Sequence, residues 1–516
     1  MKSKITLLVV LCFAFHYVKA QYHDAKWVLC YGIPGFQSNV IIDFNNGQTP
    51  QVGVTNSYVP MNIENASISD SLGNLLFFTN GTRLFDRNLN FIPGGNLTLP
   101  FDTNGAYFGL VQRQGCMFLP WPGDTNRYVL LHTTKELRLP LSYPGWVPDD
   151  VPTHLYTTLL DRTFNGGNGG IVSINQVILT DTLTNWAGGL SVTKHANGRD
   201  WWIIVKKHYR NKFFKFLLTP SGIQYIGFQN IGLDNQPRVI DSYSFSPNGE
   251  ILGGVIGGHE IALFNFDRCT GILSNYQTLN NPPTTNYGCI DIDFSSNSKV
   301  LYTNERAKIF QYDLTGINIP GAVQATRIVI ADTSFTTLLC DSPGPAIKNL
   351  YSCGALAADG KIYFPTNSAC PELTYIDYPD SIGMSCSFNY VGINIINLST
   401  ICIPYFTNYR LGPVSGSMCD SLGVGISEIQ HDFHFGITPN PVSNETVKMI
   451  YLLPQNQGGE LTIFNITGQV VYRQHLPPWS TLQYMDVSHL GGGVYSCVIR
   501  SGANQVVKKL VITGNR

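Results

Sequence analysis

The fold is decided by one stretch of sequence, Ser244-Phe-Ser-Pro-Asn-Gly-Glu-Ile-Leu252, which continues as Glu260-Ile-Ala-Leu-Phe-Asn-Phe-Asp267 and ends in Thr270-Gly271. It reads as a strand, a polar turn, a strand, a second turn, and a strand that ends in aspartate before a third turn. The same order returns in Asp293-Phe-Ser-Ser-Asn-Ser-Lys-Val-Leu301, Lys308-Ile-Phe-Gln-Tyr-Asp313 and Thr315-Gly316. Two copies of one unit with several strands predict a repeat protein built from small antiparallel sheets.

Weaker copies of this unit extend over most of the chain. They are Ser69-Asp-Ser-Leu-Gly-Asn-Leu75 with Leu84-Phe-Asp86, His195-Ala-Asn-Gly-Arg-Asp200 with Phe214-Lys-Phe-Leu217, and Leu356-Ala-Ala-Asp-Gly-Lys-Ile-Tyr363. The turns at Asn197, Asn248 and Asn297 lie 51 and 49 residues apart. This period predicts an all-β protein whose body is a β-propeller of about seven blades. Closure of the ring should place residues 27–30 beside a strand near residues 401–405, whereas an array of β-sandwiches, the alternative, has no such period.

The composition supports many short strands joined by tight turns. Charged residues make up 13% of the chain and aromatic residues 12%, and there are 50 glycines and 29 prolines. Glycine and proline favour turns, whereas Tyr and Phe favour strands. The composition therefore argues against a helical protein.

The first twenty residues have the three parts of a secretory signal peptide. Lys2 and Lys4 precede an apolar run over residues 5–15, and small residues lead to a cleavage point between Ala20 and Gln21. The apolar run is too short for a transmembrane anchor, and we expect no transmembrane segment in the mature chain. Removal of this segment leaves 30 basic and 34 acidic residues, so no basic surface is expected to bind nucleic acid.

Cysteine usage points to an oxidising compartment. Eleven cysteines remain after the signal peptide, eight of them between Cys269 and Cys419, and none forms a C-x-x-C pair. Disulfides are therefore favoured over a zinc site. Nearness in sequence predicts three pairs, Cys269 with Cys289, Cys340 with Cys353, and Cys370 with Cys386. Cys30 could pair with Cys402 or Cys419, and the odd count makes Cys497 the candidate free thiol.

A change of pattern marks a second domain. A glycine-rich stretch at residues 422–426 is followed by short alternating strands up to the C-terminus. We expect a signal peptide at 1–20, a propeller-like domain at 21–425, a linker at 426–436, and a small Ig-like β-sandwich at 437–516.

The last domain resembles the type A C-terminal sorting domain of the type IX secretion system of Bacteroidota. The matching blocks are Pro439-Asn440-Pro441, Leu461-Thr-Ile-Phe-Asn-Ile-Thr-Gly468-Gln-Val-Val471, Leu490-Gly-Gly-Gly493-Val-Tyr495 and Lys508-Lys509-Leu-Val-Ile512. The resemblance implies export from the periplasm across the outer membrane, with the type IX secretion machinery as partner. The expected location is the outer cell surface or the extracellular space, and anchoring and release stay open.

The body is similar to the propeller-like region of gliding-motility-associated surface proteins of Bacteroidota. The resemblance lies in His154-Leu-Tyr-Thr-Thr-Leu-Leu-Asp161 with Asn165-Gly-Gly-Asn-Gly-Gly170, in Thr193-Lys-His-Ala-Asn-Gly-Arg-Asp-Trp-Trp-Ile203, and in Asn408-Tyr-Arg-Leu-Gly-Pro-Val-Ser-Gly-Ser417. It implies no activity that can be assigned to particular residues.

Few residues in the sequence suggest a catalytic or metal-binding role. Lys194 and His195 precede Asp200, but no nucleophile accompanies them, so a polar turn followed by tryptophans that pack between blades is the favoured interpretation. Asp291 and Asp293 share one face of a strand, yet two carboxylates are too few for calcium, which takes six to eight oxygen ligands. The sequence has no G-x-S-x-G nucleophile elbow, no HExxH motif, no P-loop and no kinase motif. The sequence therefore predicts no catalytic residue, no cofactor and no metal site.

Two functions stay open on this basis. One is a non-enzymatic surface protein that binds an extracellular glycan or protein through loop aromatics such as Trp121, Trp146 and Tyr128. The other is a secreted hydrolase or lyase acting on polysaccharide or peptide, with His195, Asp241 and His259 as candidates for the central funnel.

Overall fold

The computed structural model describes most of the chain outside the first twenty residues. The described residues are 21–30, 38–45, 49–61, 63–97, 109–110, 112–133, 137–138, 150–183, 189–208, 210–234, 242–256, 260–280, 291–305, 307–319, 321–332, 353–365, 372–395, 403–420, 435–442, 446–451, 453, 458–477, 482–502 and 504–513.

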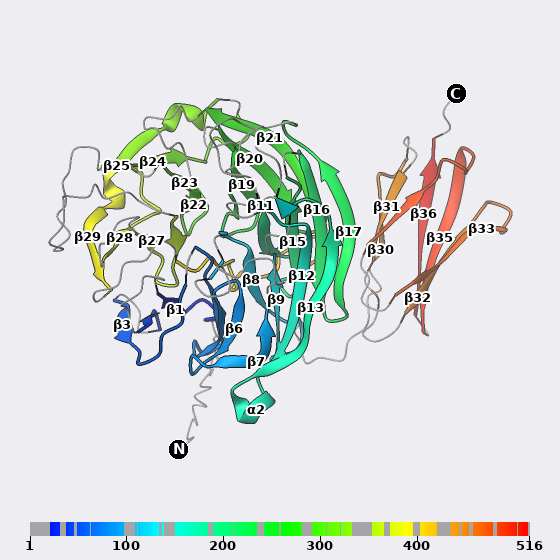
Figure 1. Cartoon of the computed structure of the whole chain (residues 1–516). Helices are drawn as coiled ribbons and strands as arrows, with labels where there is room; N and C mark the ends of the chain where they lie inside the picture. Colours follow the sequence, from blue (N-terminus) through cyan, green and yellow to red (C-terminus); the bar gives the residue numbers. More distant parts are fainter. Residues whose placement is uncertain are drawn as a thin grey trace, which may run out of the picture.

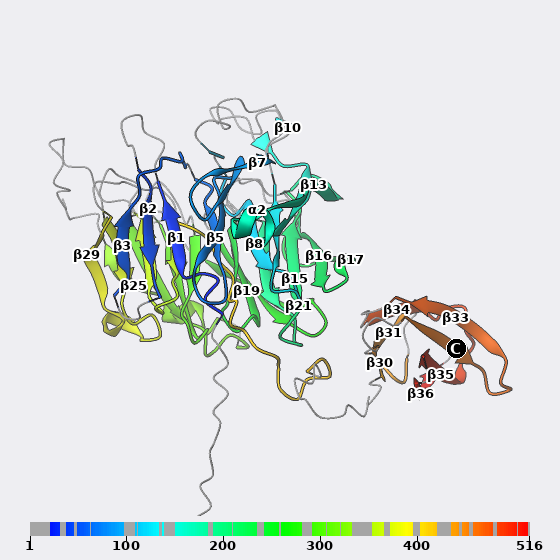
Figure 2. The same cartoon turned by 90° about the horizontal axis from the view of Figure 1, so that it is seen from below.

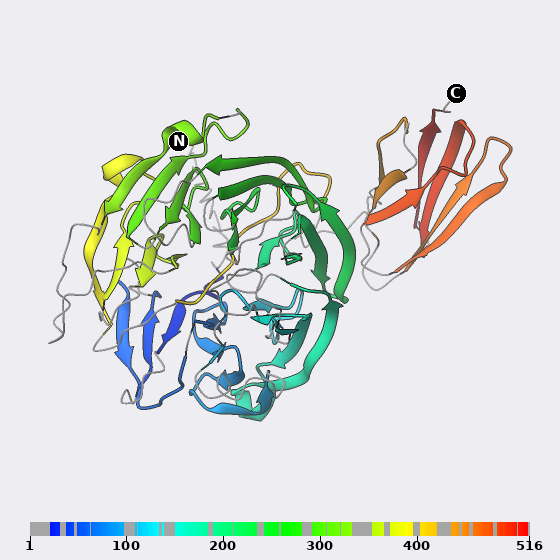
Figure 3. The same cartoon turned by 45° about the horizontal axis from the view of Figure 1, so that its top comes forward.

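The body is a ring of antiparallel sheets, seen along its axis in Figure 1 and tilted in Figure 3. The first three sheets are β1 (Lys26–Leu29), β2 (Val40–Asp43) and β3 (Gln51–Val54); β4 (Ala66–Ser69), β5 (Leu75–Thr79), β6 (Arg83–Asp86) and β7 (Phe91–Asn96); and β8 (Cys116–Pro120), β9 (Arg127–His132), β12 (His154–Asp161) and β13 (Gly170–Thr180). In each sheet the strands are hydrogen-bonded in sequence order.

Four further sheets complete the ring with the same order. They are β14 (Leu190–Lys194), β15 (Trp201–Lys206), β16 (Lys212–Thr219) and β17 (Gly222–Asn230); β18 (Ser242–Phe245), β19 (Ile251–Ile256), β20 (Glu260–Asp267) and β21 (Ile272–Asn280); β22 (Asp291–Phe294), β23 (Val300–Asn304), β24 (Lys308–Asp313) and β25 (Ile328–Asp332); and β26 (Ala355–Leu356), β27 (Ile362–Pro365), β28 (Glu372–Ile376) and β29 (Phe388–Asn394). The predicted repeat units coincide with these sheets, so the all-β, propeller-like architecture is confirmed.

Short elements join the main strands. A two-stranded sheet of β10 (Leu137–Arg138) and β11 (Asp150–Val151) lies between β9 and β12 in the sequence. The short helices are α2 (Phe164–Gly167), η1 (Gln324–Thr326) and η2 (Gly383–Cys386). Within the described residues, no helix is long and apolar enough to cross a membrane.

The first strand of each sheet lies toward the ring axis. β1 contacts β4, β4 contacts β8, β14 contacts β18, β18 contacts β22, and β22 contacts β26. Side chains on these inner strands that face the axis are therefore brought together from distant parts of the sequence.

The aspartate that ends the third strand explains why the repeat keeps its shape. Carboxylate oxygens of Asp86, Asp267 and Asp313 accept the backbone N–H two residues later, at 2.9, 2.8 and 2.8 Å. An aspartate in this position closes the tight turn between the third and fourth strands without needing a partner from elsewhere. The repeated Asp is thus a local folding signal.

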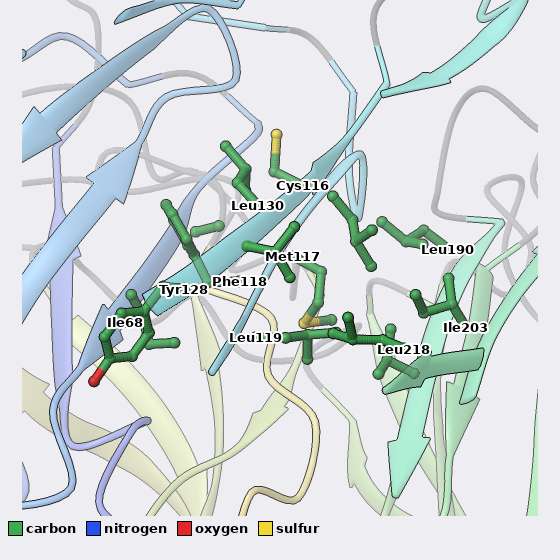
Figure 4. Close-up of a cluster of buried hydrophobic side chains, with 14 of the residues drawn as sticks. Ile68, Cys116, Met117, Phe118, Leu119, Tyr128, Leu130, Leu190, Ile203 and Leu218 are labelled. Carbon is green, nitrogen blue, oxygen red and sulfur yellow. The ribbon is translucent and has the colours of Figure 1, made fainter. Parts of the chain in front are cut away.

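Neighbouring sheets are held together by large apolar side chains. Figure 4 shows one such cluster, in which Ile68 of β4, Phe118 of β8 and Ile203 of β15 are buried together. Trp201 and Trp202 point to opposite neighbours, since their indole N–H groups donate to the carbonyls of Pro120 and Arg268 at 3.2 and 2.7 Å. The predicted packing of these tryptophans between sheets is confirmed.

The ring closes by side-chain packing. Trp27 and Phe44 pack against Tyr363 of β27, with ring centroids 5.8 and 5.7 Å away. The expected strand near residues 401–405 is not found, because residues 403–405 are not in a strand. This segment nevertheless lies beside the first sheet, since Phe406 stacks on Trp27 at 6.1 Å.

The C-terminal domain consists of two sheets around one core, and it stands apart from the ring in Figures 1 and 2. One sheet has the order β30 (Phe435–Thr438), β31 (Thr446–Tyr451) and β34 (Leu482–Asp486); the other has β33 (Val470–Leu476), β32 (Gly459–Phe464), β35 (Gly493–Ser501) and β36 (Asn504–Ile512). Their buried side chains form a cluster separate from those of the ring.

Candidate ligand-binding site on the ring axis

A segment without regular structure, residues 403–420, crosses one face of the ring after the last sheet. We call it the crossing segment. Figure 3 shows it running over the middle of the ring in gold, and Figure 2 shows that it lies on the face opposite β7 and β10. Its bonds reach four sheets or their approaches: Thr407 Oγ1 donates to Val192 O at 2.7 Å, Asn408 Nδ2 to Pro247 O at 2.8 Å, Tyr409 OH to Phe118 O at 2.7 Å, and Arg410 Nη1 to Asp24 Oδ2 at 2.8 Å.

The end of the crossing segment is fixed by a disulfide. Cys419 is bonded to Cys269, which follows β20; the two Cα atoms are 5.6 Å apart, and the sequence separation of the two cysteines is 150. The predicted pairing of Cys269 with Cys289 is therefore wrong, as is that of Cys30 with Cys419. Proximity in sequence failed here because the ring brings the turn after β20 next to a segment that follows the last sheet.

The other cysteine predictions have mixed outcomes. Cys386 is a buried free thiol, so the predicted bond to Cys370 is not supported. Cys289, Cys340, Cys370 and Cys402 lie outside the described residues. Cys497 is a free thiol in the core of the C-terminal domain, where burial raises its pKa to about 12.

A buried ion pair lies on the axis of the ring. The Arg113 guanidinium binds both carboxylate oxygens of Asp291 on β22, at 2.7 and 2.8 Å. The same carboxylate accepts from Ser242 Oγ at 3.1 Å and from the Gly354 N–H at 2.9 Å. With an opposite charge and three kinds of donor, Asp291 is fully satisfied despite its burial.

Asp293, two residues further along β22, is in a different situation. Its side chain is buried at 8% exposure, and it forms no hydrogen bond or ion pair with any residue that the structure describes. Buried carboxyl groups usually have partners, because an unpaired polar group loses its water without compensation. An unpaired carboxyl at this depth therefore needs an explanation.

Asp293 lines a cavity of about 260 Å³, which leaves room beside its carboxyl for a partner that is not part of the chain. Its walls come from the ends of β14, β18, β22 and β26, from the turns that follow β18 and β26, and from residues 405–410 of the crossing segment. The cavity is thus formed jointly by the ring and by the segment that crosses it. Asp293 is the carboxyl among its walls that forms no ion pair with a described residue.

Burial and nearby charge act together on these groups. The pKa of Asp293 is raised well above its ordinary value, chiefly by burial and then by the negative charge of Asp291, while Arg113 opposes the shift. Burial also raises the pKa of Tyr405 to about 12. Burial thus makes ionisation of the Asp293 carboxyl less favourable unless a positive charge lies beside it.

The residues that the sequence suggested for catalysis do not line this cavity. His195 is buried in the turn between β14 and β15, where its ring bonds to the Cys269 carbonyl at 3.2 Å and burial lowers its pKa. Asp200 bonds to Asn197 and Arg199 rather than to the His195 ring. The polar-turn interpretation is thus confirmed, whereas Asp241 and His259 lie outside the described residues.

Trp121 and Tyr128, which the sequence suggested as ligand-binding loop aromatics, do not line this cavity either. Tyr128 is 2% exposed on β9 and belongs to the core between sheets, so its assignment to a loop was wrong. Trp121 packs against the same core and donates to the Pro220 carbonyl at 3.3 Å. Trp146 is outside the described residues.

Sequence reasoning placed Asp291 and Asp293 on one face but missed their surroundings. Arg113, Asp24 and the crossing segment come from positions far away in sequence, and the block at residues 408–417 gave no indication that this segment would cover the ring. Only the ring geometry joins them.

In the C-terminal domain, the predicted sorting-motif residues hold two strands together. The Asn440 side chain, between Pro439 and Pro441, donates to the Lys509 carbonyl at 2.6 Å and accepts from the Val511 N–H at 2.9 Å. It therefore fastens the start of the domain to its last strand, β36.

The remaining motif residues lie in turns or on exposed edges. Gly468 has a φ of 80° in the turn between β32 and β33, a conformation that favours glycine. Tyr495 OH donates to the Gly491 carbonyl at 2.7 Å, close to Gly493 at the start of β35. Lys508 and Lys509 are exposed on β36.

Comparison with protein families identifies the class of the C-terminal domain. Residues 436–513 match the secretion system C-terminal sorting domain. The chain therefore carries a type IX sorting domain, which directs a protein to the cell surface or the extracellular space. None of the curated proteins is similar enough to the chain to count as a match.

Several solved structures resemble the chain at low sequence identity. A protein of Bacteroides fragilis proposed to be a 6-phosphogluconolactonase is 12% identical, with 73% of this chain and 96% of that chain covered and a TM-score of 0.43. The periplasmic gluconolactonase of Pseudomonas aeruginosa is 12% identical, with 90% and 99% covered and a TM-score of 0.35. A β-propeller domain of Myceliophteria thermophila is 9% identical, with 78% and 97% covered and a TM-score of 0.29. Likenesses this distant do not bear on function.

Proposed function

We propose that this chain is a secreted or cell-surface binding protein of Bacteroidota that the type IX secretion machinery exports through the periplasm. The sorting domain supports the export route. An N-terminal signal peptide, cleaved between Ala20 and Gln21, would supply the first export step. The similarity of the body to gliding-motility-associated surface proteins agrees with this location.

We further propose that the ring is a seven-bladed β-propeller within residues 21–425. It is followed by a linker at 426–436 and by an Ig-like sandwich at 437–516. Seven sheets of three or four strands among the described residues before position 421 support this count. A propeller of this kind offers a rigid frame on which ligand contacts from several sheets converge at the axis.

The observation that carries the binding function is that Asp293, a buried residue without an ion-pair or hydrogen-bond partner among the described residues, lines the axial cavity. A ligand group would provide the partner that the protein itself leaves out. The buried Asp291, by contrast, is engaged by Arg113 and serves to hold β22 in place. We therefore favour binding of an extracellular glycan or a protein side chain over catalysis.

A glycan and peptide array tests this function directly. The mature chain, residues 21–516, should bind at least one class of glycan or peptide, and Asp293→Asn should weaken that binding. Absence of any ligand across a broad array would contradict the proposal.

An enzymatic function is the second candidate, because Asp291 and Asp293 face one axis with unlike environments. Two carboxyls close to one site can act as general acid and general base. Assays for new reducing ends and for peptide cleavage would test it. Turnover that is lost in Asp293→Asn and in Asp291→Asn would favour a hydrolase or lyase over a binding module.

A further inference from the structure

We propose that the axial cavity binds a small hydroxylated organic ammonium compound, of which an amino sugar is the model, through an ion pair with Asp293. This inference rests on the proposed binding function and specifies its ligand. It follows from the charges around the cavity, from the chemistry of its walls, and from its size.

Among the described residues, Asp293 is the carboxyl around the cavity that forms no ion pair, although the charge of Arg113 acts on it from beside Asp291. Asp24 is paired with Arg410 across two hydrogen bonds of 2.8 and 2.5 Å, and Asp291 is paired with Arg113. Asp293 has no such partner among the described residues. A single positive charge on the ligand would pair with the Asp293 carboxylate. This ion pair would be strong because both charges are removed from water.

The walls offer contacts for the rest of such a ligand. Phe245 and Phe406 are among the residues that line the cavity. Ring faces attract ammonium groups and pack on the C–H faces of sugars. Thr193, Ser244 and Tyr405 also line it, and the Tyr405 hydroxyl donates to Ser244 Oγ at 3.3 Å, so polar side chains stand beside the apolar ones.

The size of the cavity limits the ligand to one small unit. Its volume of about 260 Å³ is below the roughly 300–1,000 Å³ of sites for drug-sized ligands. A single sugar ring fits this scale, whereas a rigid oligosaccharide does not. A divalent metal ion is a poorer candidate, since no group of three His, Cys, Asp or Glu side chains able to hold one occurs in the described residues.

The backbone of Gly354 lies directly beside the Asp293 carboxyl. A Cβ atom added to Gly354 would lie 2.2 Å from Asp293 Oδ2. A side chain at position 354 would therefore displace the carboxyl from its position. We expect glycine there to be a requirement of the site.

Calorimetric titration of residues 21–516 tests the inference with three matched probes. Glucosamine carries the ammonium group, glucose has a hydroxyl in its place, and N-acetylglucosamine has a neutral amide. Glucosamine should bind, and the two neutral sugars should bind at least tenfold more weakly. Equal binding of glucose, or no binding of glucosamine at millimolar concentration, would overturn the proposal.

Substitutions then test whether Asp293 forms the ion pair with the ligand. Asp293→Asn should weaken glucosamine binding at least tenfold. Asp359→Asn, which removes a carboxylate from the neighbouring turn without touching the cavity, should change it less than twofold. Unchanged binding by Asp293→Asn would overturn the assignment. Should Asp293→Asn fail to fold, Thr193→Val takes its place and is expected to weaken binding several-fold by removing one hydroxyl; unchanged binding there would count against the cavity.

The result separates this inference from the broader function. If the array finds a ligand whose binding is unaffected by Asp293→Asn and by glucosamine, the binding function stands and the cavity assignment is overturned. If the array finds no ligand but glucosamine binds through Asp293, the cavity assignment stands and the array result counts against a polymeric ligand.

Discussion

At the scale of single residues, Asp291 and Asp293 show how two identical side chains on one strand acquire different properties. Their common face followed from the two-residue period of a strand. Their difference did not, because the ion pair with Arg113 joins positions 178 residues apart. A sequence pattern reports local geometry, whereas a pKa depends on whichever charges the ring brings close.

The raised pKa of Asp293 predicts a pH-dependent stability. A carboxyl whose pKa is higher in the folded than in the unfolded state stabilises the fold fully below its unfolded pKa, about 4, and this contribution is lost as the pH rises through the folded pKa. Asp291, Arg113 and Tyr405 are the ionisable groups that act on it. Asparagine at position 293 does not titrate, so the Asp293→Asn variant does not lose this stability as the pH rises.

We therefore expect Asp293→Asn to be more stable than the wild type at pH 8. The advantage should shrink toward pH 4. Thermal unfolding of both proteins between pH 4 and pH 8, without ligand, measures it. A difference that does not vary with pH would show that Asp293 has an ordinary pKa.

Asn440 gives a second prediction at this scale. Asn440→Ala removes two hydrogen bonds to β36, at Lys509 and Val511, and should lower the stability of the C-terminal domain by about 1–2 kcal/mol. Urea unfolding of that domain measures the loss. Lys509→Ala is the control, because Lys509 contributes only its backbone carbonyl to this contact, and an equal loss in both variants would contradict the role of the Asn440 side chain.

At the scale of elements, the repeat unit was predictable and the crossing segment was not. Turn residues mark several of the sheets in the sequence, such as the aspartates that end β6, β20 and β24. The crossing segment has no hydrophobic period, because its bonds go to separate sheets rather than to a neighbouring strand. Its place on the ring is decided by tertiary contacts such as that of Tyr409 with Phe118.

The disulfide of the crossing segment should make a large contribution to stability. A bond between residues 150 apart restricts the unfolded chain strongly, and such bonds are typically worth about 2–4 kcal/mol. We expect Cys269→Ala and Cys419→Ala each to lower the stability of the ring by this amount. The double variant should be no less stable than either single variant, since one substitution already removes the bond. Thermal unfolding measures the three, and additive losses would contradict the bond.

At the scale of the whole molecule, the sequence predicted two domains with different functions. The repeat predicted the ring of sheets, and four short blocks predicted the sorting domain that residues 436–513 match. The cavity escaped prediction because it exists only where four sheets and the crossing segment meet. Local patterns thus specify the parts, while the assembled ring specifies the site.

This division of tasks leads to a prediction about export. The two units have separate hydrophobic cores, and the crossing segment is fastened to the ring up to Cys419. Deletion of residues 432–516 therefore removes no contact within the ring and should leave it folded, but trapped in the periplasm. Fusion of residues 427–516 behind a reporter with its own signal peptide should send that reporter to the surface of a host with the type IX machinery.

Cell fractionation and surface protease digestion distinguish the outcomes of these two experiments. The truncated protein should be protected from external protease yet show the same thermal unfolding of the ring as the full chain, which excludes misfolding as the cause of its retention. The fused reporter should be digested, and a fusion that carries Asn440→Ala should reach the surface less efficiently if the fold of the domain is what the machinery recognises. Surface exposure of the truncated protein together with retention of the fusion would mean that the C-terminal domain does not direct export, and that the address lies within the ring.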